Sequence, residues 1–409
     1  MKKLLAATFV ILGVAIFSLW QKGEGSPSAL YLTWLHDPAT TMTVQWHSEK
    51  EEQPRVYYKS ESEGSWHEAC GAAHVVGQAT LIWGDLRVNT VELTQLNPDT
   101  VYAFRLGESE EIYRFRTMPQ NPTRPIHFVV GGDVYQDEIL LLKKMNSQVA
   151  KMDPDFIVIG GDIAYARGRN YLFKGRYFEI KRWKTFFTAW KEQMATSDGR
   201  LIPLVVAIGN HDLESTHPNP RVKPVLFYEF FAMSEPYTSY RTLNYGSYLS
   251  LTLLDTGHTY PIRGEQTSWL ENTLKANEKM QHKMAVYHVS AYPSVYNYDK
   301  GNRKQIRRYW TPLFDQYGVK TVFEHHDHAF KRTHRLKQGK IDPDGTLYFG
   351  DGAWAVNLRT PNPADKLWYL AKTDSRNFVY LVSLDGPVGV VQAIDNEGTI
   401  FDETHLTSQ

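Results

Sequence analysis

Five short polar motifs each follow an apolar, strand-like run of the chain. The runs and their motifs read HFVVGGD, FIVIGGD, LVVAIGNHD, MAVYH and KTVFEHHDH. The carboxyl ends of strands in an open α/β sheet bring together side chains from distant parts of a sequence. We therefore expect the polar residues of all five motifs to meet at one edge of the fold.

The polar residues of these motifs are of the types that bind a pair of metal ions. Carboxylate and carbonyl oxygens suit hard cations, whereas imidazole suits iron, zinc and manganese centres. His326 and His328 are two residues apart, so on a strand both would point to one face. The glycines before the aspartates and the asparagine permit tight turns that bring backbone near the ions. The candidate ligands are Asp133, Asp162, Tyr165, Asn210, His288, His326 and His328.

Each motif alone also has an ordinary structural interpretation. An isolated Gly-Asp after a strand is a turn in most proteins, and histidines often fill cores or lie on solvated faces. The occurrence of all five motifs in one order, each after a strand-like run, favours metal binding.

Two folded parts are expected after the N-terminal segment. Residues 27–118 contain six or seven short strand patterns separated by turn signals, which is typical of a small β-sandwich. A proline-containing linker over 118–125 follows. Residues 125–409 alternate strand and helix patterns, which predicts an α/β domain with two packed β-sheets flanked by helices. The helices are expected over 137–151, 178–194, 266–278 and 304–317.

Residues 1–25 resemble a signal peptide or an N-terminal membrane anchor. Lys2 and Lys3 precede an apolar run over 4–20, and no clean cleavage site precedes Ser26, so both alternatives stay open. An extracytoplasmic protein is expected, whether secreted, periplasmic or membrane-anchored facing outward. The single cysteine, Cys70, cannot form an internal disulfide and is expected to be a buried small hydrophobe. The zero net charge does not indicate a nucleic-acid partner.

The ordered motifs resemble those of the calcineurin-like metallophosphoesterase superfamily. The tyrosine in GDIAYA and the stretch HHDHAFKRT are similar to motifs of the purple acid phosphatases. The turn at 96–102 resembles part of the fibronectin-type domain that precedes the catalytic domain in larger members. The resemblance covers residues 27–355.

This resemblance implies an acid phosphatase that hydrolyses small phosphate monoesters with a metal-activated hydroxide. It implies a ferric site at Asp133, Asp162, Tyr165 and His328. It implies a second site, for Zn, Mn or Fe, at Asp162, Asn210, His288 and His326. His211 is expected to stabilise the developing charge or protonate the leaving group. Asp212 either orients His211 or has an ordinary capping role.

Four residues depart from the pattern of the family. Tyr135 replaces a glycine of the first motif, and a bulky ring there would narrow access or point away. His325 replaces the glycine before His-x-His, and is expected to be strained or a spare imidazole. Tyr298 and Asp299 stand where plant members carry two histidines, so the leaving-group preference cannot be inherited.

Two alternatives to a monoesterase stay open. A phosphodiesterase or nucleotide pyrophosphatase can use the same ligands, and Tyr292, Tyr296 or Tyr298 would then stack on a base. A binding or adhesion protein would use the β-sandwich as its interaction module. Some arginines could contact substrate phosphate, although surface charge is the simpler interpretation for each: Arg167, Arg169, Arg303 and Arg332.

Overall fold

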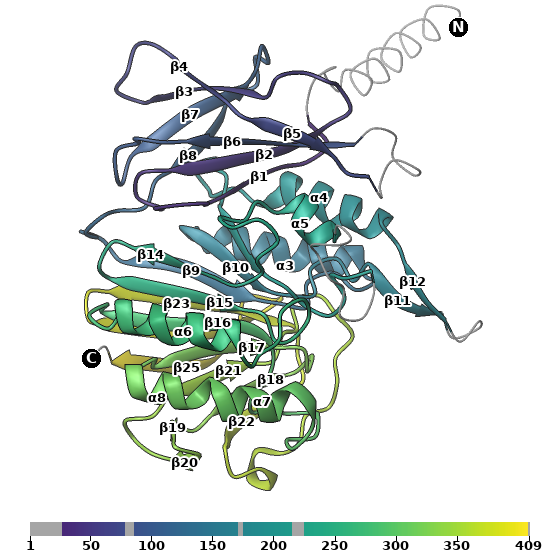
Figure 1. Ribbon diagram of the computed structural model, residues 1–409, viewed down its shortest axis with the longest axis vertical. Helices are drawn as coiled ribbons and strands as arrows, with labels where there is room; N and C mark the ends of the chain where they lie inside the picture. Colours follow the sequence, from purple (N-terminus) through teal and green to yellow (C-terminus); the bar gives the residue numbers. More distant parts are fainter. Residues whose placement is uncertain (1–26, 78–85, 171–174, 215–224, 408–409) are drawn as a thin grey trace, which may run out of the picture.

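The structure is a computed structural model that describes residues 27–77, 86–170, 175–214 and 225–407. A β-sandwich lies against one end of a larger α/β domain (Figure 1). The expected signal or anchor segment lies outside the described residues. Among the residues described, no helix is long and apolar enough to cross a membrane.

The N-terminal part is a sandwich of two antiparallel four-stranded sheets, as predicted. Its strands are β1 (Leu30–Thr33), β2 (Met42–Ser48), β3 (Arg55–Ser60), β4 (His67–Cys70), β5 (Ala72–Val75), β6 (Arg87–Leu93), β7 (Val101–Leu106) and β8 (Tyr113–Arg116). The sheet orders are β1-β2-β6-β5 and β4-β3-β7-β8. Alternation along β7 buries Tyr102 and Phe104, which explains why this pattern was recognisable.

Cys70 is exposed, so the prediction of a buried small hydrophobe was wrong. It ends β4, a short strand at the edge of its sheet, where most side chains face solvent. A residue-type preference for burial does not act where the strand itself covers no core.

The C-terminal part contains two large mixed sheets. Their orders are β13-β10-β9-β23-β24-β25 and β14-β15-β16-β17-β21-β18-β22. The first sheet consists of β9 (Ile126–Gly131), β10 (Phe156–Gly160), β13 (Leu204–Ala207), β23 (Phe378–Asp385), β24 (Val388–Asp395) and β25 (Ile400–Thr407). The second consists of β14 (Arg241–Tyr245), β15 (Leu249–Leu254), β16 (His282–Val289), β17 (Thr321–His325), β18 (Phe330–Thr333), β21 (Leu347–Gly350) and β22 (Leu370–Asp374). Two small hairpins are β11 (Arg167–Asn170) with β12 (Gly175–Phe178), and β19 (Leu336–Lys337) with β20 (Lys340–Ile341).

Helices cover the outer faces of both sheets. They are α3 (Ile139–Lys151), α4 (Lys181–Gln193), α5 (Leu226–Phe230), α6 (Glu265–Ala276), α7 (Gly301–Tyr309), α8 (Thr311–Tyr317) and the 3-10 turn η1 (Ala364–Lys366). Residues that alternate along one strand enter different cores. Val129 packs with α3 and α4, whereas Val130 lies in the core between the sheets. On the second sheet, Tyr287 packs with α6, α7 and α8 while Val286 faces the first sheet. This confirms two packed sheets between helices.

The helix expected over 304–317 is two helices. The first ends at Tyr309 and the second begins at Thr311, with Trp310 as the cap between them, and Pro312 lies in the first turn of α8. Proline has no N–H and clashes with the preceding turn, so it starts a helix more readily than it continues one.

Candidate metal centre

The five motifs meet where strands of the two sheets end. Asp133, Asp162 and Asn210 follow β9, β10 and β13, which are parallel neighbours in one sheet. His288 lies near the end of β16, and His326 follows β17, its parallel neighbour in the other sheet. Because both sheets present their carboxyl ends at this place, ligands far apart in the sequence converge.

One group of donor atoms joins Asp133, Tyr165 and His328. The Tyr165 hydroxyl oxygen lies 2.5 Å from Asp133 Oδ1 and 2.6 Å from His328 Nε2. His328 Nε2 lies 3.0 Å from Asp133 Oδ1. The three atoms therefore form one compact triangle, and all three residues are buried.

A second group surrounds His288. Its Nε2 lies 3.2 Å from Asp162 Oδ2, 3.2 Å from Asn210 Oδ1 and 3.2 Å from His326 Nδ1. The ligand atoms of Asp162, His288 and His326 all lie within 4.8 Å of one another. All seven candidate ligands are thus brought together, in two groups that match the division implied by the family resemblance, apart from the shared Asp162.

The spacing within each group suits one ion. Ligands bound at about 2.0–2.2 Å in a tetrahedral or octahedral shell stand roughly 3 Å from each other. Aspartate, tyrosine and histidine oxygens and nitrogens in such numbers suit iron, zinc or manganese. The residues present therefore fit a two-metal centre.

The electrostatics of the groups also call for cations. Burial raises the pKa of Tyr165, and the carboxylates of Asp133 and Asp162 raise it further, so a phenolate here needs a nearby cation. Burial lowers the pKa of His288, but Asp162 outweighs it and raises that pKa to about 9. Without metal, a protonated imidazole partly balances the buried carboxylates.

Five of the seven candidate ligands have a left-handed backbone. The φ angles are 55° at Asp133, 53° at Asp162, 47° at Tyr165, 80° at His326 and 56° at His328. Side chains other than glycine adopt this region at a cost and are concentrated at functional sites. The backbone is thus held in an unfavourable conformation at the residues that would bind metal.

His211 is half-buried beside the first group. Its Nδ1–H donates to the carbonyl oxygen of Arg167, and its ring stacks on Tyr165 with centroids 4.5 Å apart. These contacts fix the ring and leave Nε2 as the nitrogen available to a substrate.

Asp212 holds two of the ligand loops together. Its carboxylate accepts the backbone N–H groups of Asp162 at 2.9 Å, Ile163 at 2.8 Å and Gly209 at 2.8 Å. Its role is therefore the capping one, and the Arg167 carbonyl orients His211. Burial and the charge of Asp162 raise the pKa of Asp212 to about 7.

His325 and Tyr135 are packing residues. The His325 ring is buried, its Nδ1–H donates to the backbone carbonyl oxygen of Tyr287 at 3.0 Å, and the ring fills the space left by two glycines. A Cβ added at Gly132 or Gly160 would lie 2.4 Å or 1.9 Å from this ring. His325 does not have a positive φ, so the backbone strain expected at this residue is absent. The next residue, His326, has the positive φ instead. Tyr135 is 9% exposed and packs in the core of α3 and α4.

The three tyrosines after His288 have different surroundings. Tyr292 is buried in the core under α7 and α8. Tyr298 stacks on Tyr369 and carries the Arg307 guanidinium over its ring. Tyr296 alone of the three lies beside a candidate ligand, with its ring centroid 5.1 Å from that of His326.

The four candidate arginines also differ in their ion pairs and in their burial. Arg332 pairs with Asp402 at 2.8 Å, so its charge is neutralised by a carboxylate on β25 of the other sheet. Arg167 is 7% exposed, and the side chain of Arg303 is 13% exposed, so neither is an ordinary surface charge. The side chain of Arg169 lies outside the described part of the structure.

A buried charge network under the ligand loops was not expected from the sequence. Lys331, Glu324 and Asp351 all have fully buried side chains. Lys331 Nζ donates to Glu324 and, at 2.9 Å, contacts Asp351 Oδ1. The backbone carbonyl of Asp351 accepts the His328 N–H at 3.0 Å, which links the network to a candidate ligand.

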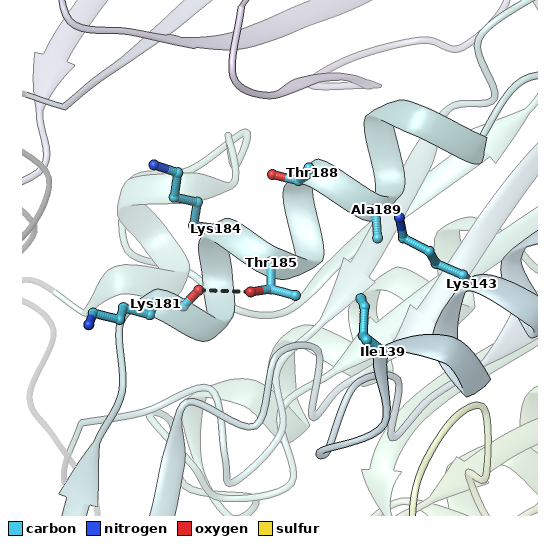
Figure 2. Close-up of a pocket in the computed structure, with 7 residues that line it drawn as sticks. All are labelled: Ile139, Lys143, Lys181, Lys184, Thr185, Thr188 and Ala189. Atoms are coloured by element: carbon cyan, nitrogen blue, oxygen red, sulfur yellow. Dashed lines mark hydrogen bonds between the residues drawn. The ribbon is translucent and has the colours of Figure 1, made fainter.

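A hollow of about 530 Å³ lies between α3 and α4 (Figure 2), and its lining includes none of the candidate ligands. Lysines and aliphatic stems line it, and Lys143 is paired with Glu192. It contains no carboxylate or imidazole, and nothing in its lining matches the chemistry of the motifs.

Comparisons with known proteins place the chain in a family. Residues 27–117 match the purple acid phosphatase N-terminal domain, and residues 126–330 match the calcineurin-like phosphoesterases. Probable purple acid phosphatase 20 of Arabidopsis thaliana is 29% identical, over 80% of this chain and 75% of its own. Purple acid phosphatase 15 of the same plant is 26% identical, over 70% and 58%.

Solved structures show the same fold. A purple acid phosphatase from yellow lupin seeds superposes with a TM-score of 0.76 at 16% identity, covering 92% of this chain and 74% of its own. A structure of PhoD gives 0.63 at 13% identity, covering 94% and 90%. The chain belongs to the calcineurin-like phosphoesterase family and carries the N-terminal domain of the purple acid phosphatases.

Proposed function

We propose that this protein is an exported acid phosphatase that hydrolyses small phosphate monoesters at a centre of Fe(3+) and a second divalent metal, either Zn, Mn or Fe. The two compact groups of donor atoms around Tyr165 and His288 are the observation that carries this proposal. The names of the Arabidopsis relatives support the choice of acid phosphatase.

Asp133, Tyr165 and His328 would hold the ferric ion with Asp162, and Asp162 with Asn210, His288 and His326 would hold the divalent ion. When bound at these residues, two such ions would supply charge for the phosphate oxygens and would lower the pKa of water. The chain itself supplies the group that acts on the leaving oxygen, which is His211. Because His211 Nδ1–H donates to the Arg167 carbonyl, Nε2 is the nitrogen left to stabilise charge or to give a proton to the departing oxygen.

The place of action is proposed from the N-terminal segment. Lys2 and Lys3 before an apolar run suit export, and export suits the recovery of phosphate from external esters. The partner proposed is a small phosphate ester, with the N-terminal segment as a membrane tether if it is retained.

A phosphodiesterase is the second candidate, because Tyr296 lies open to solvent beside His326 and offers a ring to a second substituent. We expect p-nitrophenyl phosphate to be hydrolysed at least about tenfold faster than bis(p-nitrophenyl) phosphate, equal to about 1.4 kcal/mol in the barrier. The monoester presents more negative charge to two cations than the diester does. Initial rates on both esters at equal concentration measure this, and a clear diester preference would replace the first candidate with the second.

A further inference from the structure

Three side chains form a cationic, aromatic cluster beside His326. They are Tyr296, Arg303 and Arg359, called here the Tyr296 cluster. The guanidinium carbons lie 4.7 Å (Arg303) and 5.1 Å (Arg359) from the centre of the Tyr296 ring. The ring itself is 5.1 Å from that of His326 and 36% exposed, so a ligand at the metal centre can reach this cluster.

The backbone around the candidate ligands positions this cluster. Arg359 Nη1 donates to the carbonyl oxygen of His326 at 2.8 Å, and its backbone N–H donates to His328 O at 3.0 Å. Asp327, between these two histidines, accepts the N–H groups of Val295 at 2.7 Å and Tyr296 at 3.3 Å. The cluster is therefore fixed to the loop that carries two candidate ligands, and a shift of one would move the other.

The guanidinium group of Arg303 has N–H donors without acceptors in the described part of the chain. Arg303 Nε and Nη2 are buried and have no hydrogen-bond partner within the described residues. Asp327 Oδ1, which is also buried without a hydrogen-bond partner among the described residues, is 4.0 Å from Arg303 Nη2, beyond hydrogen-bonding distance. Buried N–H groups of arginine normally have acceptors, and its planar fork matches carboxylate and phosphate oxygens. The Arg303 guanidinium therefore has hydrogen-bonding capacity that an anionic group of a ligand would use.

We propose that the Tyr296 cluster binds a second anionic group of the substrate, a carboxylate or phosphate on the alcohol portion of the monoester. The proposal rests on the proposed function, because the scissile phosphate would occupy the metal centre. Water adds to that phosphorus and the P–O bond to the alcohol breaks, giving orthophosphate and an alcohol that keeps its second anion. The preferred substrates are then dianionic at one end and charged again at the other.

Two matched pairs of compounds test the cluster in the full-length, metal-loaded protein. Glycerol 3-phosphate and 3-phosphoglycerate differ by a carboxylate in place of a hydroxymethyl group. Fructose 6-phosphate and fructose 1,6-bisphosphate differ by a second phosphate. The measured quantity is the ratio of kcat/KM within each pair, which separates a carboxylate preference from a phosphate preference.

We expect the wild type to favour the more anionic member of at least one pair, and Arg303→Gln to lower that ratio about tenfold, mainly through KM. Arg359→Gln should lower the same ratio. Arg308→Gln is the matched control, because this exposed arginine lies on the same helix and stacks on Tyr309 instead. Circular dichroism establishes that each variant is folded.

Equal ratios in wild type, Arg303→Gln and Arg308→Gln would overturn the proposal while leaving the phosphatase activity intact. If the wild type hydrolysed neither p-nitrophenyl phosphate nor any of the four compounds, the proposed function would fail, and calorimetric titration with the same four compounds would then test binding at the Tyr296 cluster. The wild type must then bind the more anionic member of a pair at least about threefold tighter, and Arg303→Gln must lose that difference.

Discussion

Asp162→Ala is expected to lose phosphatase activity by about 10³-fold or more in kcat/KM, equal to about 4 kcal/mol in the barrier. Asp162 is 1% exposed, and its Oδ2 lies 3.2 Å from His288 Nε2 while Oδ1 accepts the His211 N–H at 2.6 Å. One side chain thus serves a metal group and positions the loop of the proposed acid. Its removal should also reduce the bound metal, measured by elemental analysis.

The Asp162→Ala variant is expected to fold. Asp162 and Asp212 are buried carboxylates that repel each other, since Asp162 helps to raise the pKa of Asp212. Removing one charge relieves this repulsion in the metal-free chain. Asp365→Ala is the control, because its carboxylate is 73% exposed and pairs with Lys366. Wild-type rates and metal content in Asp162→Ala would require the site to be abandoned.

Lys331→Met is expected to destabilise the protein by about 3–5 kcal/mol. The change removes the cation between Glu324 and Asp351, leaving two buried carboxylates with no counter-charge. Burial already raises the pKa of Asp351 to about 6, even with Lys331 opposing this rise. The thermal midpoint and the denaturant midpoint measure the loss.

Lys366→Met supplies the comparison for Lys331→Met, because the Lys366 side chain is 70% exposed and surface changes of this kind stay within about 0.5 kcal/mol. Adding Glu324→Gln to Lys331→Met should restore part of the stability, since it removes an unpaired charge. Equal midpoints for Lys331→Met and Lys366→Met would show that the buried network contributes nothing to the folded state.

The convergence of the candidate ligands was predictable because their motifs lie at or just after the ends of apolar strands, and strand ends converge in this fold class. Asp133, Asp162 and Asn210 follow three neighbouring strands of one sheet, so sequence pattern and topology coincide. The sandwich was predictable for a related reason: alternation along strands such as β7 marks the buried face.

Features that depend on packing between distant segments were not predictable. Lys331 looks like a surface cation in the stretch AFKRT, and only the fold brings Glu324 and Asp351 to it. Arg359 lies in a loop far along the chain from Tyr296 and follows no motif. His325 departs from the glycine of the family, and its fit depends on Gly132 and Gly160 from another sheet.

The visible absorption spectrum of the purified, air-oxidised protein is the most direct test of the proposed centre. Tyr165 is buried, and its hydroxyl oxygen lies 2.6 Å from His328 Nε2 and 2.5 Å from Asp133 Oδ1. A ferric ion held by these residues would bind this oxygen as a phenolate. We expect a broad purple band that disappears in Tyr165→Phe, while Tyr237→Phe, at an exposed tyrosine, keeps it. A colourless protein that still holds two metals per chain would contradict ferric iron on Tyr165 and leave a metallophosphoesterase of another kind.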